Sequence, residues 1–283
     1  MPKPSSPVRP RKSSRFPWRH VATLGCLGLA ALAWLPGCAQ TPPAAPITFR
    51  VMTYNIHHAE GLDGKVDTAR IAELIKQQGA DLVALQEVDK GVRRTAGRDL
   101  TAELAAQTGL TGVFSNNFYF QDGEYGNAVL SRFPIKRWTN HHYQMLRPGE
   151  QRGLLELELD VQGRPLVFMN THIDYRADDS ERWRNVAEIE AQVRRHAATP
   201  IILCGDFNNL PAGRVYERLR TILQDTWAAI GAGHGFSFPA HKPDRRIDYI
   251  WYTPPPTLKP LKIWLPRSEA SDHLPLVAEF ELR

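Results

Sequence analysis

Cysteine is scarce in this sequence, with three cysteines among 283 residues. Cys26 and Cys38 lie in the N-terminal segment, so Cys204 is the one cysteine of the remaining chain. A framework of disulfides is therefore excluded, and the apolar run that contains Cys204 indicates a small core residue. Stability must come from an apolar core, which a single domain of about 245 residues can build.

Long hydrophobic runs are also missing. The apolar stretch at residues 21–35 has 15 residues, which is too short for a comfortable membrane span. Residues 1–20, which precede this stretch, contain six basic residues and no acidic one. The sequence Leu35-Pro36-Gly37-Cys38 lies at the end of the stretch. A basic N-terminal segment, a short apolar segment and a small residue before the expected cleavage site are typical of a secretory signal peptide. The sequence therefore predicts such a signal over residues 1–37.

The sequence Leu-x-Gly-Cys resembles the lipobox of bacterial lipoproteins, although Pro36 is unusual inside such a box. We therefore expect Cys38 to be the lipidated N-terminus, and Ala39 after it favours the outer membrane. Residues 38–47 form a Pro/Ala tether to a domain at residues 48–283. The alternative is an uncleaved N-terminal anchor. Either arrangement places the domain outside the cytoplasm, in the cell envelope.

A basic excess is absent once the signal is removed. The chain has 35 basic and 30 acidic residues, and six of the basic ones precede Cys38, which leaves 29 against 30. Domains that bind long nucleic acids usually carry a clear positive excess. This balance favours a small substrate over a long nucleic acid. Separately, we expect the protein to be a monomer.

The hydrophobic periodicity predicts a mixed α/β protein without internal repeats. Asp67 and Asp99 are expected to cap the first two helices. Helices are expected at 67–78, 99–108, 180–196 and 212–223. Strands are expected at 48–55, 81–87, 111–120, 126–131, 135–143, 153–161, 164–172, 200–204, 247–253, 260–266 and 275–282. The aromatic run at 118–120 is interpreted as core.

Six apolar runs end or begin in polar residues. The run at 200–204 leads into Asp206 and Asn208, which share one side of a sheet rim. This pair alone could be an ordinary Asp/Asn turn. Further polar residues at the ends of such runs are Asn55, Glu87, His172, Asp248, Asp272 and His273. Because α/β proteins place their chemistry at sheet rims, we expect one acidic site with imidazoles beside it.

This set of motifs resembles the endonuclease/exonuclease/phosphatase superfamily, which includes pancreatic deoxyribonuclease, apurinic endonucleases, neutral sphingomyelinases and inositol-polyphosphate 5-phosphatases. The resemblance covers residues 48–283. It implies a four-layer α/β sandwich, in which two packed mixed β-sheets are flanked by helices. It also implies a metal-dependent phosphoric ester hydrolase.

The resemblance implies a divalent metal site at Glu87, with Asn55 beside it and Asp272 as a further carboxylate on the metal side. Such oxygen ligands suit Mg²⁺ or Mn²⁺. Alternatively, Glu87 pairs with Arg93 or Arg94. Apurinic endonucleases have an acid where this chain has His57. His57 and His58 could form a softer metal site, but adjacent residues of a strand point to opposite faces.

The resemblance implies catalytic roles for residues at the other strand ends. Asp206 and Asn208 match the pair that positions and activates water, and His172 matches a residue on the phosphate or leaving group. Asp248 and His273 match a carboxylate–imidazole pair, in which His273 is either an acid–base catalyst or a stabilising cation. Arg152 matches an arginine that some members place on the phosphate, or it is a rim charge.

We therefore expect an extracytoplasmic, lipid-anchored phosphodiesterase or phosphatase that acts on a small phosphoester. One alternative is a secreted endonuclease of DNA or RNA with the same site. Another is a non-catalytic envelope lipoprotein that uses the rim to bind a partner.

Overall fold

The computed structural model describes residues 45–254 and 256–283, within a compact unit that spans residues 44–283. The expected signal at residues 1–37, most of the tether and Cys38 lie outside the described residues. Among the residues described, no helix combines the length and the apolar character needed to cross a membrane.

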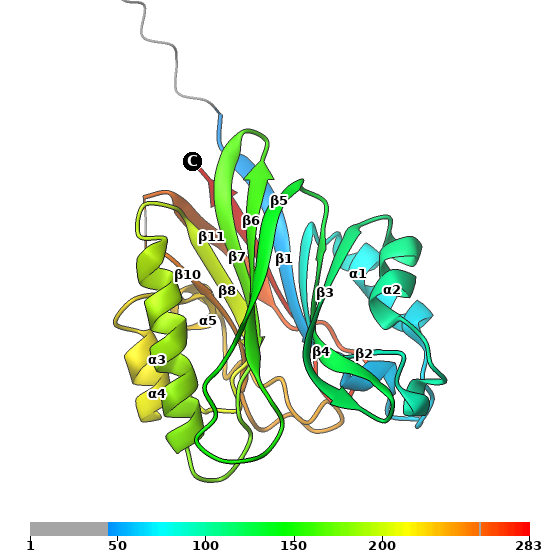
Figure 1. Ribbon diagram of the computed structural model, residues 1–283. Coiled ribbons are helices and arrows are strands. Elements are labelled where there is room, and N and C mark those ends of the chain that lie inside the picture. The colour runs from blue at the N-terminus through cyan, green and yellow to red at the C-terminus, as the bar shows by residue number, and fades with distance from the viewer. Residues whose placement is uncertain (1–44, 255) are drawn as a thin grey trace, which may run out of the picture. The chain divides into compact units, whose positions relative to one another are not determined.

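The described chain forms two mixed six-stranded sheets (Figure 1). The first sheet has the order β11-β12-β1-β2-β4-β3, and the second has the order β5-β6-β7-β8-β10-β9. Each contains one central parallel pair, β1 with β2 and β7 with β8, and its other pairs are antiparallel. The strands are β1 Ile47–Asn55, β2 Leu82–Lys90, β3 Thr111–Phe120, β4 Gly123–Ser131, β5 Ile135–His142, β6 Gly153–Val161, β7 Arg164–His172, β8 Ile201–Asp206, β9 Gln224–Asp225, β10 Asp248–Tyr252, β11 Leu258–Trp264 and β12 Leu276–Leu282.

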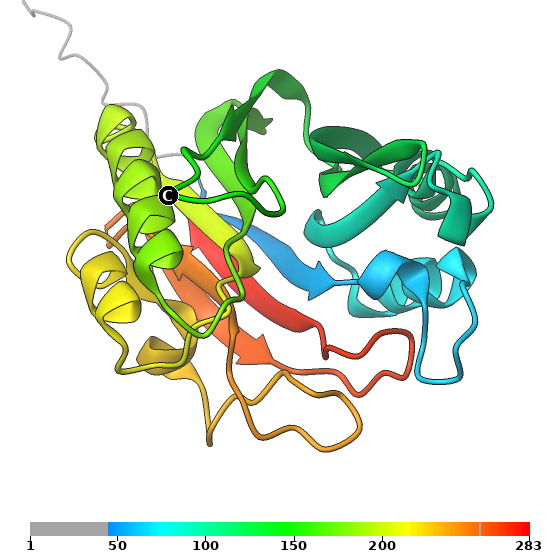
Figure 2. The same ribbon diagram turned by 60° about the horizontal axis from the view of Figure 1, so that its bottom comes forward.

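Helices cover the outer face of each sheet, which confirms the expected four-layer sandwich (Figures 1 and 2). The helices α1 (Thr68–Gln78) and α2 (Leu100–Thr108) pack on the first sheet. The helices α3 (Ser180–Arg195) and α4 (Arg214–Leu219) pack on the second. A short helix, α5 (Thr226–Ile230), follows β9.

The strands alternate their side chains between two apolar layers. In β8, Ile202 and Cys204 face the core between the sheets, whereas Ile201 and Leu203 face the α3 layer. This alternation follows from the two-residue period of a strand. All six residues of β8 are buried, as expected for a strand with both faces covered. Cys204 is a buried free thiol, which confirms its interpretation as a core residue.

Local capping explains where two helices begin. Asp67 accepts a hydrogen bond from the Ala69 backbone at 2.8 Å, and Asp99 accepts one from Ala102 at 2.9 Å. Both caps satisfy N–H groups that the first helical turn leaves free. The expected helix at 212–223 is shorter than predicted, since α4 covers residues 214–219 and β9 and α5 follow soon after.

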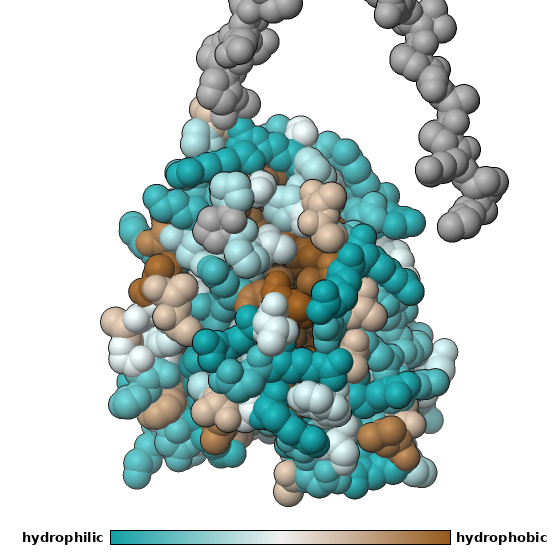
Figure 3. Space-filling model, turned by 90° about the vertical axis from the view of Figure 1, so that its left-hand side faces the viewer, coloured by the Kyte–Doolittle hydropathy of each residue, from teal (hydrophilic) through white to brown (hydrophobic). Residues whose placement is uncertain are grey.

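One side face of the molecule shows apolar side chains in a hollow ringed by hydrophilic ones (Figure 3). By contrast, the end of the sandwich where β1, β2, β7 and β8 finish is polar, because the last residue of each of these strands is polar (Figure 2). The two parallel pairs therefore bring the polar strand ends of both sheets to one place.

Candidate active site

Three of the polar strand ends lie side by side in the second sheet. In the register of β7, β8 and β10, His172 lies next to Asp206, and Asp206 lies next to Asp248. All three residues are buried. The strand pairing thus positions an imidazole and two carboxylates across neighbouring strands, although they are distant in the sequence.

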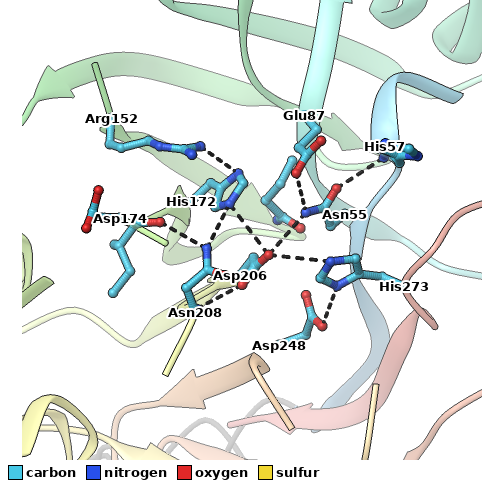
Figure 4. Close-up of polar contacts among 12 residues, drawn as sticks. Asn55, His57, Glu87, Arg152, His172, Asp174, Asp206, Asn208, Asp248 and His273 are labelled. Carbon is cyan, nitrogen blue, oxygen red and sulfur yellow. Dashed lines mark hydrogen bonds and ion pairs between the residues drawn. The ribbon is translucent and has the colours of Figure 1, made fainter. Parts of the chain in front are cut away.

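Glu87 comes from a bulge in the first sheet. The register between β2 and β4 shifts between Leu85 and Val88, and Glu87 has a φ of 59°. Asn55 Nδ2 donates to Glu87 Oε1 at 2.9 Å and to Asp206 Oδ2 at 3.1 Å (Figure 4). The Asn55 amide therefore joins the carboxylates of the two sheets, while its oxygen accepts the His57 backbone N–H.

The surroundings of Glu87 fit a divalent cation. Arg94 makes two 2.8 Å hydrogen bonds to Asp89, and Arg93 pairs with Asp122. In the part of the chain that is described, Glu87 has no ion pair with an arginine or lysine. A carboxylate that lies in a pocket without a cationic partner calls for a compensating charge. Oxygen ligands with room for water suit Mg²⁺ or Mn²⁺.

Asp272 provides a further carboxylate near the same place. Its Oδ1 accepts from Ser271 Oγ at 3.3 Å and lies 4.0 Å from His57 Nδ1. Ser271 also donates to the Asn55 carbonyl at 2.7 Å, which ties this loop to the end of β1. Both Asp272 and Glu87 line the same pocket.

His273 and Asp248 form a buried pair. His273 Nδ1 donates to Asp248 Oδ2 at 2.9 Å, and Ser237 Oγ donates to the same oxygen at 2.6 Å. Burial alone would lower the pKa of His273, but the charge and hydrogen bond of Asp248 outweigh it and raise that pKa to about 10. His273 is therefore a cation at neutral pH, and its Nε2 lies 3.7 Å from Asp206 Oδ2.

Asp206 is the carboxylate that the other groups surround. Burial and the nearby charge of Asp248 raise the pKa of Asp206 above its ordinary value. Its Oδ1 accepts the Asn208 backbone N–H at 2.9 Å. Glycine at residue 205 lets β8 approach β7 closely here, since a Cβ at Gly205 would lie 2.0 Å from the Thr171 carbonyl oxygen.

His172 lies on the other side of Asp206 and has a different charge state. Arg152 Nη1 donates to His172 Nδ1 at 2.9 Å, and Nε2 lies 3.5 Å from Asp206 Oδ2 and 3.1 Å from the Asn208 amide. Burial, aided by the charge of Arg152, lowers the pKa of His172 well below its ordinary value. The neutral ring can accept a hydrogen from only one of its two donor neighbours, Arg152 Nη1 at Nδ1 or Asn208 Nδ2 at Nε2, and the other ring nitrogen carries the N–H.

Arg152 is not a loose rim charge. Its side chain is 6% exposed, contacts His172, and pairs with Glu150 at 2.6 Å. Its Nε is buried without a hydrogen-bond partner. The guanidinium therefore lies in the wall of the site.

These residues surround a pocket of about 440 Å³. Its charged lining is mixed, with the acids Glu87, Glu150, Asp206 and Asp272 and the arginines Arg94, Arg152 and Arg245. Its aromatic lining is Phe118, Phe120, Tyr125, Tyr175 and Phe238. Asp248 lies behind this surface, in contact with His273.

The aromatic wall corrects one interpretation. Phe118 and Phe120 were expected in the core, but both line the pocket, and Tyr119 between them is 78% exposed. Sequence reasoning also missed Phe238 and Arg245, which lie in an irregular segment. Phe238 packs against the His273 ring with centroids 4.5 Å apart, and no local periodicity signals such a contact.

The adjacent histidines also differ from expectation. The strand β1 ends at Asn55, and His57 and His58 lie in a short 3₁₀ turn with φ values of 44° and 45°. Their ring centroids are 4.4 Å apart. The expectation that they point to opposite faces is therefore wrong, because the alternation of a strand does not apply to this turn.

Comparison with known proteins identifies the family. Residues 52–273 match the Endonuclease/Exonuclease/phosphatase family. The uncharacterized protein YbhP of Escherichia coli K12 is 26% identical over 251 residues, which cover 83% of this chain and 97% of YbhP.

Solved structures share the architecture as well. The endonuclease/exonuclease/phosphatase of Beutenbergia cavernae has a TM-score of 0.70 at 26% identity, covering 83% of this chain and 72% of that one. The mannosyl-6-phosphatase Bt3783 of Bacteroides thetaiotaomicron has a TM-score of 0.68 at 17% identity, with coverages of 82% and 99%. With Glu87, Asp206, His172 and His273 gathered at one pocket, this chain belongs to the endonuclease/exonuclease/phosphatase family of metal-dependent phosphoric ester hydrolases.

Proposed function

We propose that this protein hydrolyses a small phosphomonoester or phosphodiester at the pocket around Asp206, on the outer side of the cytoplasmic membrane. The observation that supports this proposal is the contrast between the two imidazoles that flank Asp206. His273 is a cation held by Asp248, whereas His172 is a neutral imidazole beside Arg152. Their Nε2 atoms lie 3.7 Å and 3.5 Å from the same oxygen of the buried Asp206 carboxylate.

Asp206 is suited to accept the proton of the attacking water. A carboxylate whose pKa is raised is a stronger base than an ordinary aspartate and still ionises near neutral pH. The backbone N–H of Asn208 and the Asn55 amide hold its two oxygens in place. As the water oxygen bonds to phosphorus, the water's proton passes to Asp206, the phosphorus–oxygen bond of the leaving group breaks, and the departing oxygen takes up a proton from solvent.

His273 is suited to stabilise the negative charge of the phosphoryl group. With a pKa of about 10 it keeps its proton at neutral pH, which favours the role of a fixed cation over that of an acid that gives up its proton. Arg152, which contacts His172, adds a cationic donor on the opposite side. Preorganised donors and cations of this kind are often the largest contribution to catalysis.

The fitting metal site is Glu87 with Asp272, while Asn55 orients Glu87. When bound there, Mg²⁺ or Mn²⁺ would supply Lewis-acid charge beside the phosphate and the departing oxygen.

A small substrate is favoured by the pocket and by the charge. A volume of about 440 Å³ suits a compact molecule, and the residues after the expected signal have no basic excess. The phosphatase named in the solved structure of Bt3783 agrees with a phosphomonoester. The aromatic wall would then contact the non-phosphate part of the substrate.

The location rests on the sequence. We infer lipidation of Cys38 from the Leu-x-Gly-Cys pattern and the preceding signal-like segment, and an outer-membrane anchor from Ala39.

A substrate panel tests the proposed reaction. The panel should contain sugar phosphates, nucleotides, lipid-headgroup phosphoesters, duplex DNA and RNA, each with Mg²⁺, Mn²⁺ or Ca²⁺. We expect release of phosphate or alcohol from a small phosphoester, and none from the Asp206→Asn variant. Preferential cleavage of DNA or RNA would instead support the secreted endonuclease.

A further inference from the structure

The turn after β1 brings two imidazoles to Glu87. Three consecutive residues, His57, His58 and Ala59, have positive φ values of 44°, 45° and 65°. The His57 and His58 rings consequently lie next to each other, with an interplanar angle of 66°. One nitrogen of each ring and one oxygen of Glu87 all lie within 4.8 Å of one another. Figure 4 shows His57 beside Asn55, whose amide holds Glu87.

These separations are compatible with a metal ion. Ligands that bind Zn²⁺ at about 2.1 Å lie at most about 4.2 Å apart, so small side-chain rotations bring the three atoms onto one ion. Two nitrogens and one oxygen make the ligand set of a site that keeps an open position for water or substrate. Glu87 lines the pocket, so that position would face it.

The hydrogen-bonding of the His58 ring supplies independent support. His58 is 6% exposed, and its Nδ1 is buried with no hydrogen-bond partner. Its other nitrogen, Nε2, lies 3.3 Å from Glu60 Oε2. Donation from Nε2 to Glu60 leaves Nδ1 as a bare acceptor. This is the arrangement of a metal-binding histidine, whose second nitrogen is usually held by a carboxylate.

His57 shows the same feature more loosely. Its Nδ1 lies 4.0 Å from Asp272 Oδ1, so a carboxylate flanks one nitrogen of each ring. Arg94, whose positive charge acts on His58, is bound by Asp89 through two hydrogen bonds, which partly offset that charge.

We propose that His57, His58 and Glu87 bind a divalent transition-metal ion of the Zn²⁺ or Co²⁺ type. Imidazole nitrogens select such ions over Mg²⁺, which prefers oxygen ligands. This site adds a second, softer ion to the one that the proposed hydrolase needs at Glu87 and Asp272, and the two ions share the Glu87 carboxylate. The second ion would bring a further positive charge to the substrate phosphate.

Metal titration without substrate tests the proposal. The full chain, stripped of metal and kept in excess Mg²⁺, is titrated with Zn²⁺ by calorimetry and with Co²⁺ by visible absorption. We expect one tight Zn²⁺ equivalent and a Co²⁺ band typical of nitrogen ligands. His57→Gln and His58→Gln should each weaken Zn²⁺ binding by about tenfold or more, and Glu60→Gln by about tenfold through the tautomer of His58.

Matched controls separate this site from others. His241→Ala changes an exposed histidine and should leave binding unchanged. Asp206, Asp248 and His273 form another cluster of potential ligands, so His273→Gln is included and should retain the tight equivalent. Circular dichroism verifies that each variant is folded. If His58→Gln does not fold, His57→Gln and Glu60→Gln carry the test.

Two outcomes would overturn the proposal: absence of tight Zn²⁺ binding in excess Mg²⁺, or binding that survives His57→Gln and His58→Gln but is lost in His273→Gln. Because the titration uses no substrate, either outcome leaves the proposed hydrolysis intact. Conversely, failure of the substrate panel leaves the metal measurement valid.

Discussion

His273 Nδ1 lies 2.9 Å from Asp248 Oδ2, and both side chains are almost completely buried. The contact joins β10 to the loop before β12 and directs His273 Nε2 toward Asp206. The other oxygen of Asp248 has no hydrogen-bond partner among the described residues. The carboxylate therefore interacts mainly with His273 and Ser237, as a residue that orients and charges an imidazole should.

The first prediction concerns this pair as a unit. Asp248→Asn and His273→Ala should each reduce kcat on the order of 10²-fold or more, as loss of a positioned catalytic group does. The double variant should be hardly slower than His273→Ala, because Asp248 acts through the imidazole. Steady-state kinetics of the four proteins measure this, and fully multiplicative losses would show two independent roles.

The second prediction concerns the metal at Glu87. Chelation should abolish hydrolysis, and Glu87→Gln should lower it by about 100-fold or more, since a neutral amide of equal size binds a hard cation poorly. Glu73→Gln, which removes an exposed carboxylate paired with Lys76, is the matched control and should keep full activity. Activity that persists in excess chelator would remove Glu87 from the catalytic metal site.

The third prediction concerns pH. Asp206 must be ionised to act as a base, so kcat should rise with pH through its raised pKa. His273 must remain protonated, so activity should fall as pH rises through about 10. Asp248→Asn removes the charge that raises both pKa values, and both limbs of the profile should move to lower pH. If the pH–rate profile of Asp248→Asn has both limbs at the wild-type pH, groups other than Asp206 and His273 control the activity.

The fourth prediction concerns location. Wild-type protein should fractionate with membranes, and Cys38→Ser should release it, because the acyl chains supply the anchor. Fractionation with detection of the C-terminal domain measures this, and mass spectrometry identifies the modified residue. A processed wild-type chain that stays in the soluble fraction would contradict lipidation.

The fifth prediction concerns Gly205. Gly205→Ala places a Cβ 2.0 Å from the Thr171 carbonyl oxygen, and the strand pairing must shift to accommodate it. We expect the free energy of unfolding to fall by about 3 kcal/mol. Gly97→Ala, with a φ of 72° and open space around its Cβ position, should cost about 1 kcal/mol. Denaturant titration compares them, and equal losses would contradict the steric account.

The sequence by itself determined the order and kind of most of the regular elements, though not of β9 and α5. Strand alternation and helix caps act over a few residues, so the run at 200–204, which lies within or beside β8, and the caps Asp67 and Asp99 could be recognised without a structure. The polar strand ends were recognisable in the same way. A parallel pair of strands brings its ends together, so their meeting at one site could also be anticipated.

Only the tertiary structure decided how these residues interact. The charge states of His172 and His273 differ because one faces Arg152 and the other Asp248, and no local pattern encodes either contact. The positive φ values at His57 and His58 turned an expected alternation into a pair of neighbouring rings. Long-range packing determines the charge state of a buried side chain, because the residues around it come from distant parts of the sequence. Backbone turns determine which neighbouring rings come into contact.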